Sequence, residues 1–346
     1  MFELLKSVRT AIFPPAGKLR FINFCLYHAC DLACSFCQVP THKVKTMSAS
    51  QRGEAFRRLK LMSAPACKMS ILGGEPTLQP QLILEAVADA ASAGFLVNVV
   101  TNGYALTERL IIQLGNAGLD HLAVSVDVPQ PGALRTDLEK ALTLLQVARR
   151  QGITPVINVL VGSKTDLKAL KAFCQQVFDA GCFVSLLAMS PNVGGMFSSA
   201  SREEVPTNGQ LREIVRWLKR KKAFTGLATS TFGYLNVLSE IGQGGERSLW
   251  HCADHFRSQH AGSGRGFLYV DSDGTLGPCQ EFRSNLNILE IPEERLSLEF
   301  LDQELSGITK RCEGCTYNCY IMEEKLRGAS VLAEIPTALR LVQVKS

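Results

Sequence analysis

Strand-like and helix-like segments alternate along the first half of the chain. Six apolar, β-rich runs are expected to be strands: Phe21–Tyr27, Cys67–Leu72, Phe95–Thr101, Leu119–Asp127, Thr154–Val161 and Cys182–Met189. Amphipathic runs between them are expected to be helices: Ser48–Met62, Gln79–Ala93, Leu106–Asn116, Thr136–Arg150 and Thr165–Ala180. Gly94, Gly118, Gly152 and Gly181 each stand between a helix and the next strand, where a helix C-cap favours glycine.

This alternation predicts an α/β fold with a parallel sheet. Six strand–helix units are too few for a closed eight-fold barrel, so we expect an open, partial (β/α)6 barrel. The 346 residues, 46% of them hydrophobic, allow one large core with a smaller appendage. In folds of this kind the chemistry gathers at the carboxyl ends of the strands.

Polar signatures follow the expected strands one after another. Gly73-Gly74-Glu75-Pro76-Thr77 comes after the second strand, and Thr101-Asn102-Gly103 comes after the third. Ser125 and Asp127 close the fourth strand, and Asn158 lies in the fifth. Each signal alone is ordinary turn chemistry. Their common position at strand ends predicts that they form one site.

Three cysteines follow the first expected strand at short spacing: Cys30, Cys34 and Cys37. Their thiolates can converge on one centre and leave a coordination position open, whereas a closed structural zinc site uses four protein ligands. Zinc with a distant fourth ligand, such as His28 or His42, and plain buried cysteines are the alternative interpretations.

The residues from Phe21 to Met189 resemble the radical SAM superfamily. The Cys-x3-Cys-x2-Cys triplet after the first strand matches the hallmark of that family, and the aromatic Phe36 before the last cysteine is typical of it. Gly73-Gly74-Glu75-Pro76 resembles the glycine-rich motif of the family after strand two, which receives the methionine amino group.

The resemblance implies a [4Fe-4S] cluster on Cys30, Cys34 and Cys37, with S-adenosylmethionine (SAM) on its open iron. Reduction would cleave SAM to a 5′-deoxyadenosyl radical that abstracts hydrogen from a substrate. Ser125 is expected to bind the SAM carboxylate or ribose, and Asn158 the ribose. Asn102 is a further candidate for cofactor binding, and Asp127 either contributes to binding or only caps its strand.

A second group of cysteines lies in the tail: Cys252, Cys279, Cys312, Cys315 and Cys319. Between the first two, Phe267 to Leu276 reads as a hairpin with an Asp-Gly turn. Gly274 followed by Pro278-Cys279 resembles the start of a SPASM/twitch extension, which implies a second, auxiliary [4Fe-4S] cluster. A zinc knuckle is the alternative. We therefore expect a lead-in (1–20), the barrel (21–230), a SPASM/twitch-like domain (231–330) and a tail (331–346).

One four-iron cluster needs at most four of these five thiols. Spacing favours Cys279, Cys312 and Cys315 as ligands, with Cys252 or Cys319 as the fourth. Cys319 is the candidate for a free thiol that donates a hydrogen atom to a substrate radical, or else it is a ligand or a buried small side chain.

Composition limits the classes of partner. The net charge is +5, and the one basic cluster, Arg216 to Lys222, is expected to be the solvated face of a helix rather than a nucleic-acid site. No apolar run is long enough to predict a membrane span. Because residues 1–17 lack the pattern of a signal peptide, we expect a cytoplasmic protein.

The function expected is hydrogen abstraction from a small biosynthetic molecule, leading to dehydrogenation, epimerisation or elimination. Because 29 residues precede Cys30, a cobalamin domain or a fused peptide-recognition domain is not expected. The alternatives are cross-linking or epimerisation of a ribosomal peptide, and a non-catalytic iron–sulfur scaffold or electron-transfer protein. A flavodoxin or ferredoxin is the expected electron donor.

Overall fold

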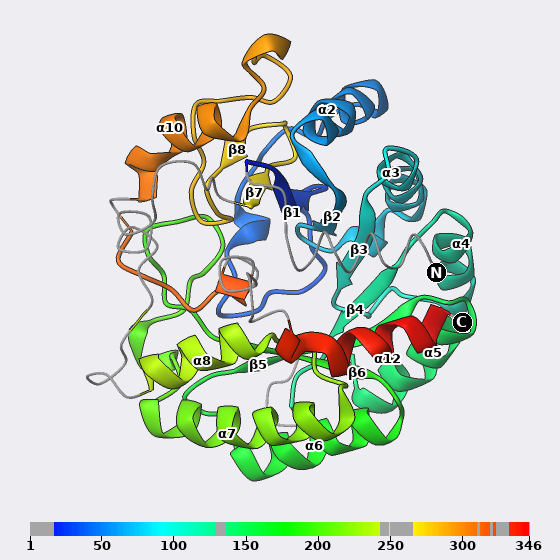
Figure 1. Cartoon of the computed structure of the whole chain (residues 1–346), viewed down its shortest axis with the longest axis vertical. Coiled ribbons are helices and arrows are strands. Elements are labelled where there is room, and N and C mark those ends of the chain that lie inside the picture. The colour runs from blue at the N-terminus through cyan, green and yellow to red at the C-terminus, as the bar shows by residue number, and fades with distance from the viewer. Residues whose placement is uncertain are drawn as a thin grey trace.

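The fold is an open, curved eight-stranded sheet with helices packed on its outer face (Figure 1). The computed structural model describes residues 17–128, 136–242, 249, 266–309, 312–318, 321–322 and 332–345. The strands are β1 (Leu19–Cys25), β2 (Ser63–Leu72), β3 (Leu96–Thr101), β4 (His121–Ser125), β5 (Thr154–Val161), β6 (Phe183–Ala188), β7 (Phe267–Val270) and β8 (Leu276–Gly277).

The helices follow the strands in the expected order through β6 and then continue into the tail. They are α2 (Ala49–Leu61), α3 (Pro80–Ser92), α4 (Glu108–Asn116), α5 (Leu138–Arg150), α6 (Leu167–Asp179), α7 (Asn208–Thr225), α8 (Phe232–Ile241), α10 (Leu298–Thr309) and α12 (Ile335–Lys345). All six expected strands and all five expected helices are confirmed. The four glycines expected at helix ends have positive φ angles between 69° and 98°.

The strand order is β6-β5-β4-β3-β2-β1-β7-β8, and every pair is parallel except β7 with β8. The sheet is therefore not closed into a barrel, as the sequence predicts. The hairpin expected in the tail is confirmed as β7–β8. Its first strand extends the main sheet by pairing with β1, from Phe21↔Phe267 to Phe24↔Val270, which the sequence did not predict.

The two faces of the sheet differ in chemistry because strand side chains alternate between them. Residues that face the helices are apolar and fully buried, such as Phe24 of β1 and Ile71 of β2. On the opposite, concave face, neutral polar side chains recur in paired positions: Asn23, Ser70, Asn98, Ser125, Asn158 and Ser185. The concave face of the curved sheet therefore carries hydrogen-bonding groups among its side chains.

Several element boundaries differ from the expected ones by a few residues. β2 begins at Ser63, four residues before the expected start, because Ser63 pairs with Leu19 across a register shift in the ladder. β4 ends at Ser125, so Asp127 lies beyond the strand. A short 3-10 turn at Arg202–Glu204 precedes α7, which begins after the capping residue Thr207.

The basic cluster on α7 is not simply a solvated face. Arg216 and Arg220 are exposed, but the Lys222 side chain is only 1% exposed and lies 2.8 Å from Glu334. Its Nζ also donates to the Ala228 carbonyl and to Thr337 of α12, at 2.6 and 2.8 Å. This buried pair fixes α12 to α7, so the expectation of full solvation is wrong for Lys222.

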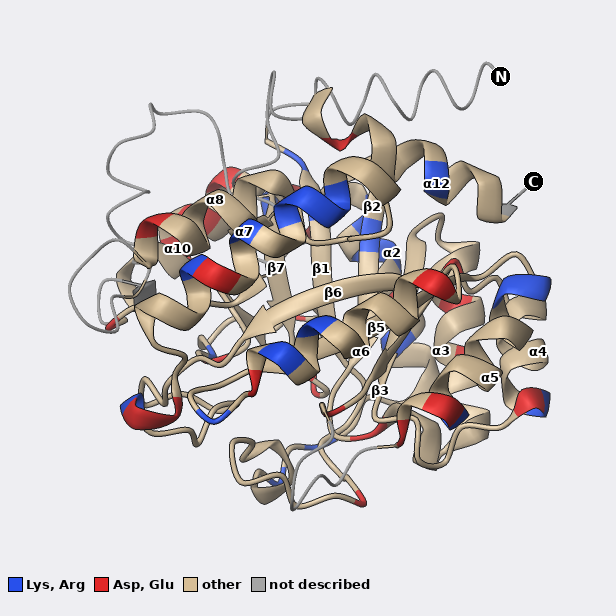
Figure 2. Ribbon diagram, turned by 90° about the horizontal axis from the view of Figure 1, so that it is seen from below, with Lys and Arg blue, Asp and Glu red and all other residues tan. Residues whose placement is uncertain are grey.

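The surface charges give no sign of a single basic face on the helices that Figure 2 shows, where Lys and Arg are interspersed with Asp and Glu. No helix within the described ranges is both long enough and apolar enough to cross a membrane.

Candidate active site

The cysteine triplet lies on the loop that leaves the carboxyl end of β1. Cys30, Cys34 and Cys37 are all half-buried, and none is in a disulfide. The loop turns back on itself, since the Cys37 amide donates to the Cys34 carbonyl at 3.0 Å. The Leu32 amide donates to the Cys30 Sγ at 3.4 Å. Three accessible thiols on one short turn form a donor set that suits an iron–sulfur cluster.

The thiol of Cys30 is protonated in the metal-free chain. Burial, with further contributions from the charges of Asp31, Glu75 and the nearby Cys34, raises its pKa to about 11. A metal ligand must be a thiolate, so metal binding at Cys30 would release a proton.

Glu75 organises the loop after β2. Its carboxylate is 1% exposed and accepts four hydrogen bonds. Oε1 accepts from the Thr77 amide at 2.9 Å and from the hydroxyls of Thr77 and Thr101, each at 2.6 Å. Oε2 accepts from the Asn102 amide at 2.6 Å. Glu75 therefore ties the strand-two loop to the end of β3 through its side chain.

Gly73 and Gly74 bring the strand-two loop against the start of the cysteine loop. The Gly74 amide donates to the Tyr27 carbonyl and the Glu75 amide donates to the Ala29 carbonyl, both at 2.8 Å. A Cβ on Gly74 would lie 1.9 Å from the Ala29 oxygen, and one on Gly73 would lie 2.3 Å from the Tyr27 oxygen. Glycine is required here because two backbone segments touch, whatever else the loop binds. Pro76 follows, buried, in a short 3-10 turn.

Asn102 connects the third loop to the first. Its Nδ2 donates to Asp31 Oδ1 at 2.8 Å, and its Oδ1 accepts from the Tyr104 amide at the same distance. Asp31 is the residue after Cys30. The loops after β1, β2 and β3 are thus joined around the triplet by Glu75 and Asn102.

Ser125, at the end of β4, and Asn158, within β5, are neighbours. They are paired in the ladder, and the Val126 amide donates to the Asn158 carbonyl at 3.1 Å. Asn158 is buried, while Ser125 and Asp127 are half-buried. Both β4 and β5 end at the same edge of the sheet as the cysteine loop.

Three of the tail cysteines are gathered in one place. Cys315 acts electrostatically on both Cys279 and Cys312, and burial raises the pKa of both of these thiols. Cys279 and Cys312 are half-buried, and Cys315 is buried. Cys252 and Cys319 lie outside the described residues.

Glu281 connects the tail cysteines with the triplet. Its carboxylate accepts from the Phe197 and Ser198 amides at 2.9 and 3.1 Å, and it is hydrogen bonded to the Tyr317 hydroxyl. Ser198 pairs in turn with Cys37 in an antiparallel bridge. Burial is the main cause of a raised pKa at Glu281. Segment 197–198 therefore lies between the triplet and the tail cysteines: it pairs with Cys37 on one side and donates to Glu281 on the other.

The sequence did not single out Glu281 or Tyr317 as parts of a site, and it named His28 only as an alternative zinc ligand. It placed Thr77 and Thr101 within the loop signatures without a role. The available signal for the Glu75 network was a carboxylate two residues before Thr77, with Thr101 at the end of the next strand, whereas the contacts of Glu281 join distant parts of the chain.

Comparison with known proteins agrees with this geometry. Residues 24–177 match the family model described as the radical SAM superfamily. The PqqA peptide cyclase of Xanthomonas campestris pv. campestris (strain B100) is 31% identical over 147 residues, which cover 39% of this chain and 38% of that protein.

Two solved structures share the fold. Streptococcus suis SuiB bound to S-adenosylmethionine has a TM-score of 0.62 at 14% identity, covering 85% of this chain and 68% of that chain. Native anSMEcpe with bound AdoMet and Cp18Cys peptide has a TM-score of 0.56 at 15% identity, covering 95% and 99%.

The chain therefore carries a radical SAM domain over residues 24–177. The aligned segment spans only 38% of the length of the PqqA peptide cyclase.

Proposed function

We propose that the chain is a radical SAM enzyme that holds a [4Fe-4S] cluster on Cys30, Cys34 and Cys37. When bound, that cluster and SAM supply a 5′-deoxyadenosyl radical for hydrogen abstraction. The observation that carries the proposal is the convergence of three loops, joined by Glu75 and Asn102, around three thiols within the matched domain. A scaffold without a substrate has no need of this arrangement.

The residues around the triplet have distinct roles in this proposal. The loop of Gly73, Gly74, Glu75 and Pro76 receives the methionine part of SAM, and Glu75 holds its shape. Ser125 and Asn158 are adjacent on β4 and β5 and can donate to the carboxylate or ribose of SAM. Asn102, Asp127 and Phe36 border the same edge.

The tail cysteines are proposed to hold an auxiliary cluster. Cys279, Cys312 and Cys315 supply three ligands, with Cys252 or Cys319 as the fourth. Electrostatic coupling of Cys315 to the other two supports this set. Anaerobic reconstitution should give about eight irons per chain if both clusters have four. Saturation at four irons, with zinc in the tail, would instead favour a zinc knuckle.

A ribosomal peptide is the substrate class we propose. The PqqA peptide cyclase, SuiB with its precursor peptide SuiA, and anSMEcpe with the Cp18Cys peptide are named for peptides or bind them. A small biosynthetic molecule is the second candidate.

The experiment uses the anaerobically reconstituted chain with SAM, a flavodoxin or ferredoxin as electron donor, and a precursor peptide encoded beside its gene. A mass change in the peptide that depends on SAM supports the peptide proposal. SAM cleavage with no change in any such peptide would favour the small-molecule candidate.

Cys319 retains its proposed role as a hydrogen-atom donor. With the true substrate, Cys319→Ala should keep both clusters and SAM cleavage but lose the solvent-derived deuterium in the product. Loss of auxiliary iron in this variant would make Cys319 a ligand and end this proposal.

A further inference from the structure

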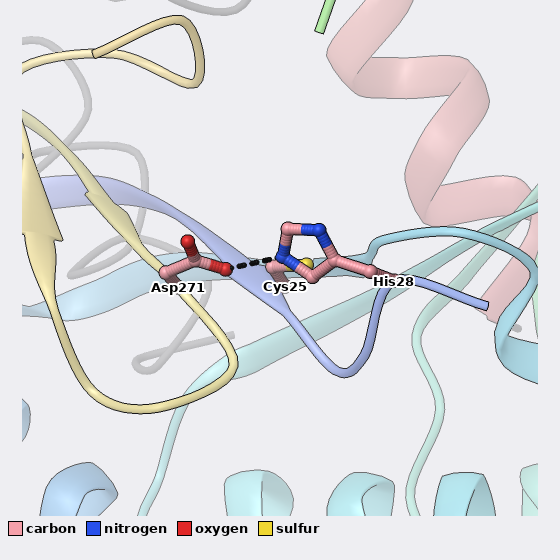
Figure 3. A group of neighbouring side chains, drawn as sticks. All are labelled: Cys25, His28 and Asp271. Atoms are coloured by element: carbon pink, nitrogen blue, oxygen red, sulfur yellow. Dashed lines mark hydrogen bonds and ion pairs between the residues drawn. The ribbon is translucent and has the colours of Figure 1, made fainter. Parts of the chain in front are cut away.

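A buried group of three side chains lies beside the cysteine loop and outside the roles assigned so far. It consists of Cys25 at the end of β1, His28 in the following loop, and Asp271 directly after β7 (Figure 3). One ligand atom from each lies within 4.8 Å of the others. Because β7 pairs with β1 in parallel, the two strands end side by side and bring together residues 243 positions apart.

The spacing of the three side chains would allow a metal ion, but the contacts favour a direct hydrogen bond between His28 and Asp271, which we call the clasp. The His28 Nε2 lies 2.7 Å from Asp271 Oδ1, whereas two ligands of one tetrahedral zinc ion would stand about 3.3 Å apart. Asp271 Oδ1 also accepts from the Ser272 amide at 2.7 Å, and its Oδ2 lies 2.8 Å from Arg283 Nη1. The carboxylate is thus already surrounded by donors.

Both partners of the clasp are buried. Asp271 is 0% exposed and His28 is 4% exposed. Arg283 supplies a cation 2.8 Å from Asp271 Oδ2, so the charge of the buried Asp271 carboxylate is compensated. Asp271 contacts His28 directly, whereas Asp273 pairs with Arg283.

The backbone of His28 lies between two parts of the candidate SAM site. Its carbonyl and that of Ala29 are the groups against which Gly74 packs without room for a Cβ. The neighbouring Tyr27 and Ala29 carbonyls accept from the strand-two loop at 2.8 Å. Cys30 follows two residues after His28. A shift of His28 would therefore move both the first cysteine and the surface that receives the glycine loop.

We propose that Asp271 is a positioning residue for the SAM site, acting through His28. The clasp fixes the segment 26–30, so the hairpin completes a site whose other parts lie within residues 24–177. The effect on SAM rests on the proposed function, but the effect on the loop does not.

The test compares Asp271→Asn with Asp273→Asn in the full chain. Asp273 belongs to the same turn and also pairs with Arg283, but it is 26% exposed, and its carboxylate contacts Arg283 and the Thr275 amide rather than His28. Removal of a residue that orients a metal ligand typically costs about 10–100-fold in affinity or activity.

Two readouts are measured. In the cluster-free chain, hydrogen exchange of the amides of residues 26–37 should be faster in Asp271→Asn and unchanged in Asp273→Asn. After reconstitution, Asp271→Asn should keep the iron content of the wild type but raise the KM for SAM by about 10–100-fold, with a smaller change in kcat. Equal behaviour of the two variants in both readouts would overturn the proposal. Faster exchange throughout the chain would also overturn it, because it would indicate a general loss of stability.

His28 variants give an independent test that leaves the hairpin intact, should Asp271→Asn fail to fold. His28→Gln keeps a side-chain N–H that can reach Asp271, and His28→Leu does not. We expect Gln to retain more of the loop protection than Leu; equal loss would overturn the clasp.

If the wild type bound one equivalent of zinc and Asp271→Asn bound none, the three residues would form a metal site, and the clasp would be wrong. If the wild type fails to cleave SAM, the proposed function fails, and the exchange measurement still decides whether Asp271 positions the loop.

Discussion

Gly74→Ala should damage the candidate SAM site by overpacking alone. Gly74 does not have a positive φ angle, so alanine causes no backbone strain of that kind there. The new Cβ would lie 1.9 Å from the Ala29 oxygen and 2.5 Å from the His28 oxygen. To reach an ordinary contact of 3.4 Å, the two backbone segments must separate by about 1.5 Å.

The size of the effect follows from that displacement. Overpacking of this kind costs about 1–3 kcal/mol of unfolding free energy. A displacement of about 1 Å at a reacting centre can cost about 100-fold in rate. We therefore expect SAM cleavage by Gly74→Ala to fall by at least about that factor.

The assay pairs urea unfolding of the cluster-free chain with 5′-deoxyadenosine formation by the reconstituted chain. Gly53→Ala is the matched control: Gly53 lies within α2, and a Cβ there meets nothing within 4 Å. Alanine should raise stability at this position by about 0.5–1 kcal/mol. The reasoning is refuted if Gly74→Ala is as stable and as active as the wild type, or if both variants change stability in the same direction.

Two further predictions concern buried charges. In Glu75→Gln one donor of the Glu75 network would face the new amide N–H, so we expect the free energy of unfolding in urea to fall by about 2–3 kcal/mol. The control Glu85→Gln changes a half-exposed carboxylate and should lose less than about 1 kcal/mol. Similar losses in the two variants would refute the role of the network. Burial lowers the pKa of Lys68 to about 8 from an ordinary value of 10.5. Between about pH 8 and pH 10.5 the unfolded chain binds more protons at Lys68 than the folded chain does. The stability of the wild type relative to Lys68→Met should therefore rise with pH over this range. Urea unfolding at both ends of this range measures the difference, and a constant difference would contradict it.

The local parts of the fold were predictable because their signals are local. Apolar periodicity and the glycines at helix ends predict the six β/α units, and the capping pattern from Thr207 to Gln210 was available to place the start of α7. The parallel pairing of β7 with β1 was not predictable in this way, since the sequence around Phe267 shows only a hairpin.

In the candidate site too, the sequence predicts the features that have local signals and misses those that depend on tertiary contacts. Strand-end placement predicts that Cys30, Gly74 and Asn102 lie together, because parallel strands end at one edge. The sequence suggests Glu75 as a cofactor contact, whereas the structure directs its carboxylate to protein donors. The contact of His28 with Asp271 depends on tertiary pairing alone.

The central claim is that Cys30, Cys34 and Cys37 hold the cluster that supports SAM cleavage. The measurement that tests it is 5′-deoxyadenosine formation after anaerobic reconstitution and reduction, for the wild type and for the variant with all three cysteines changed to alanine. The wild type should form 5′-deoxyadenosine, and the variant should form none while still binding iron in its tail. Cleavage of SAM by the triple variant at the wild-type rate would contradict the account.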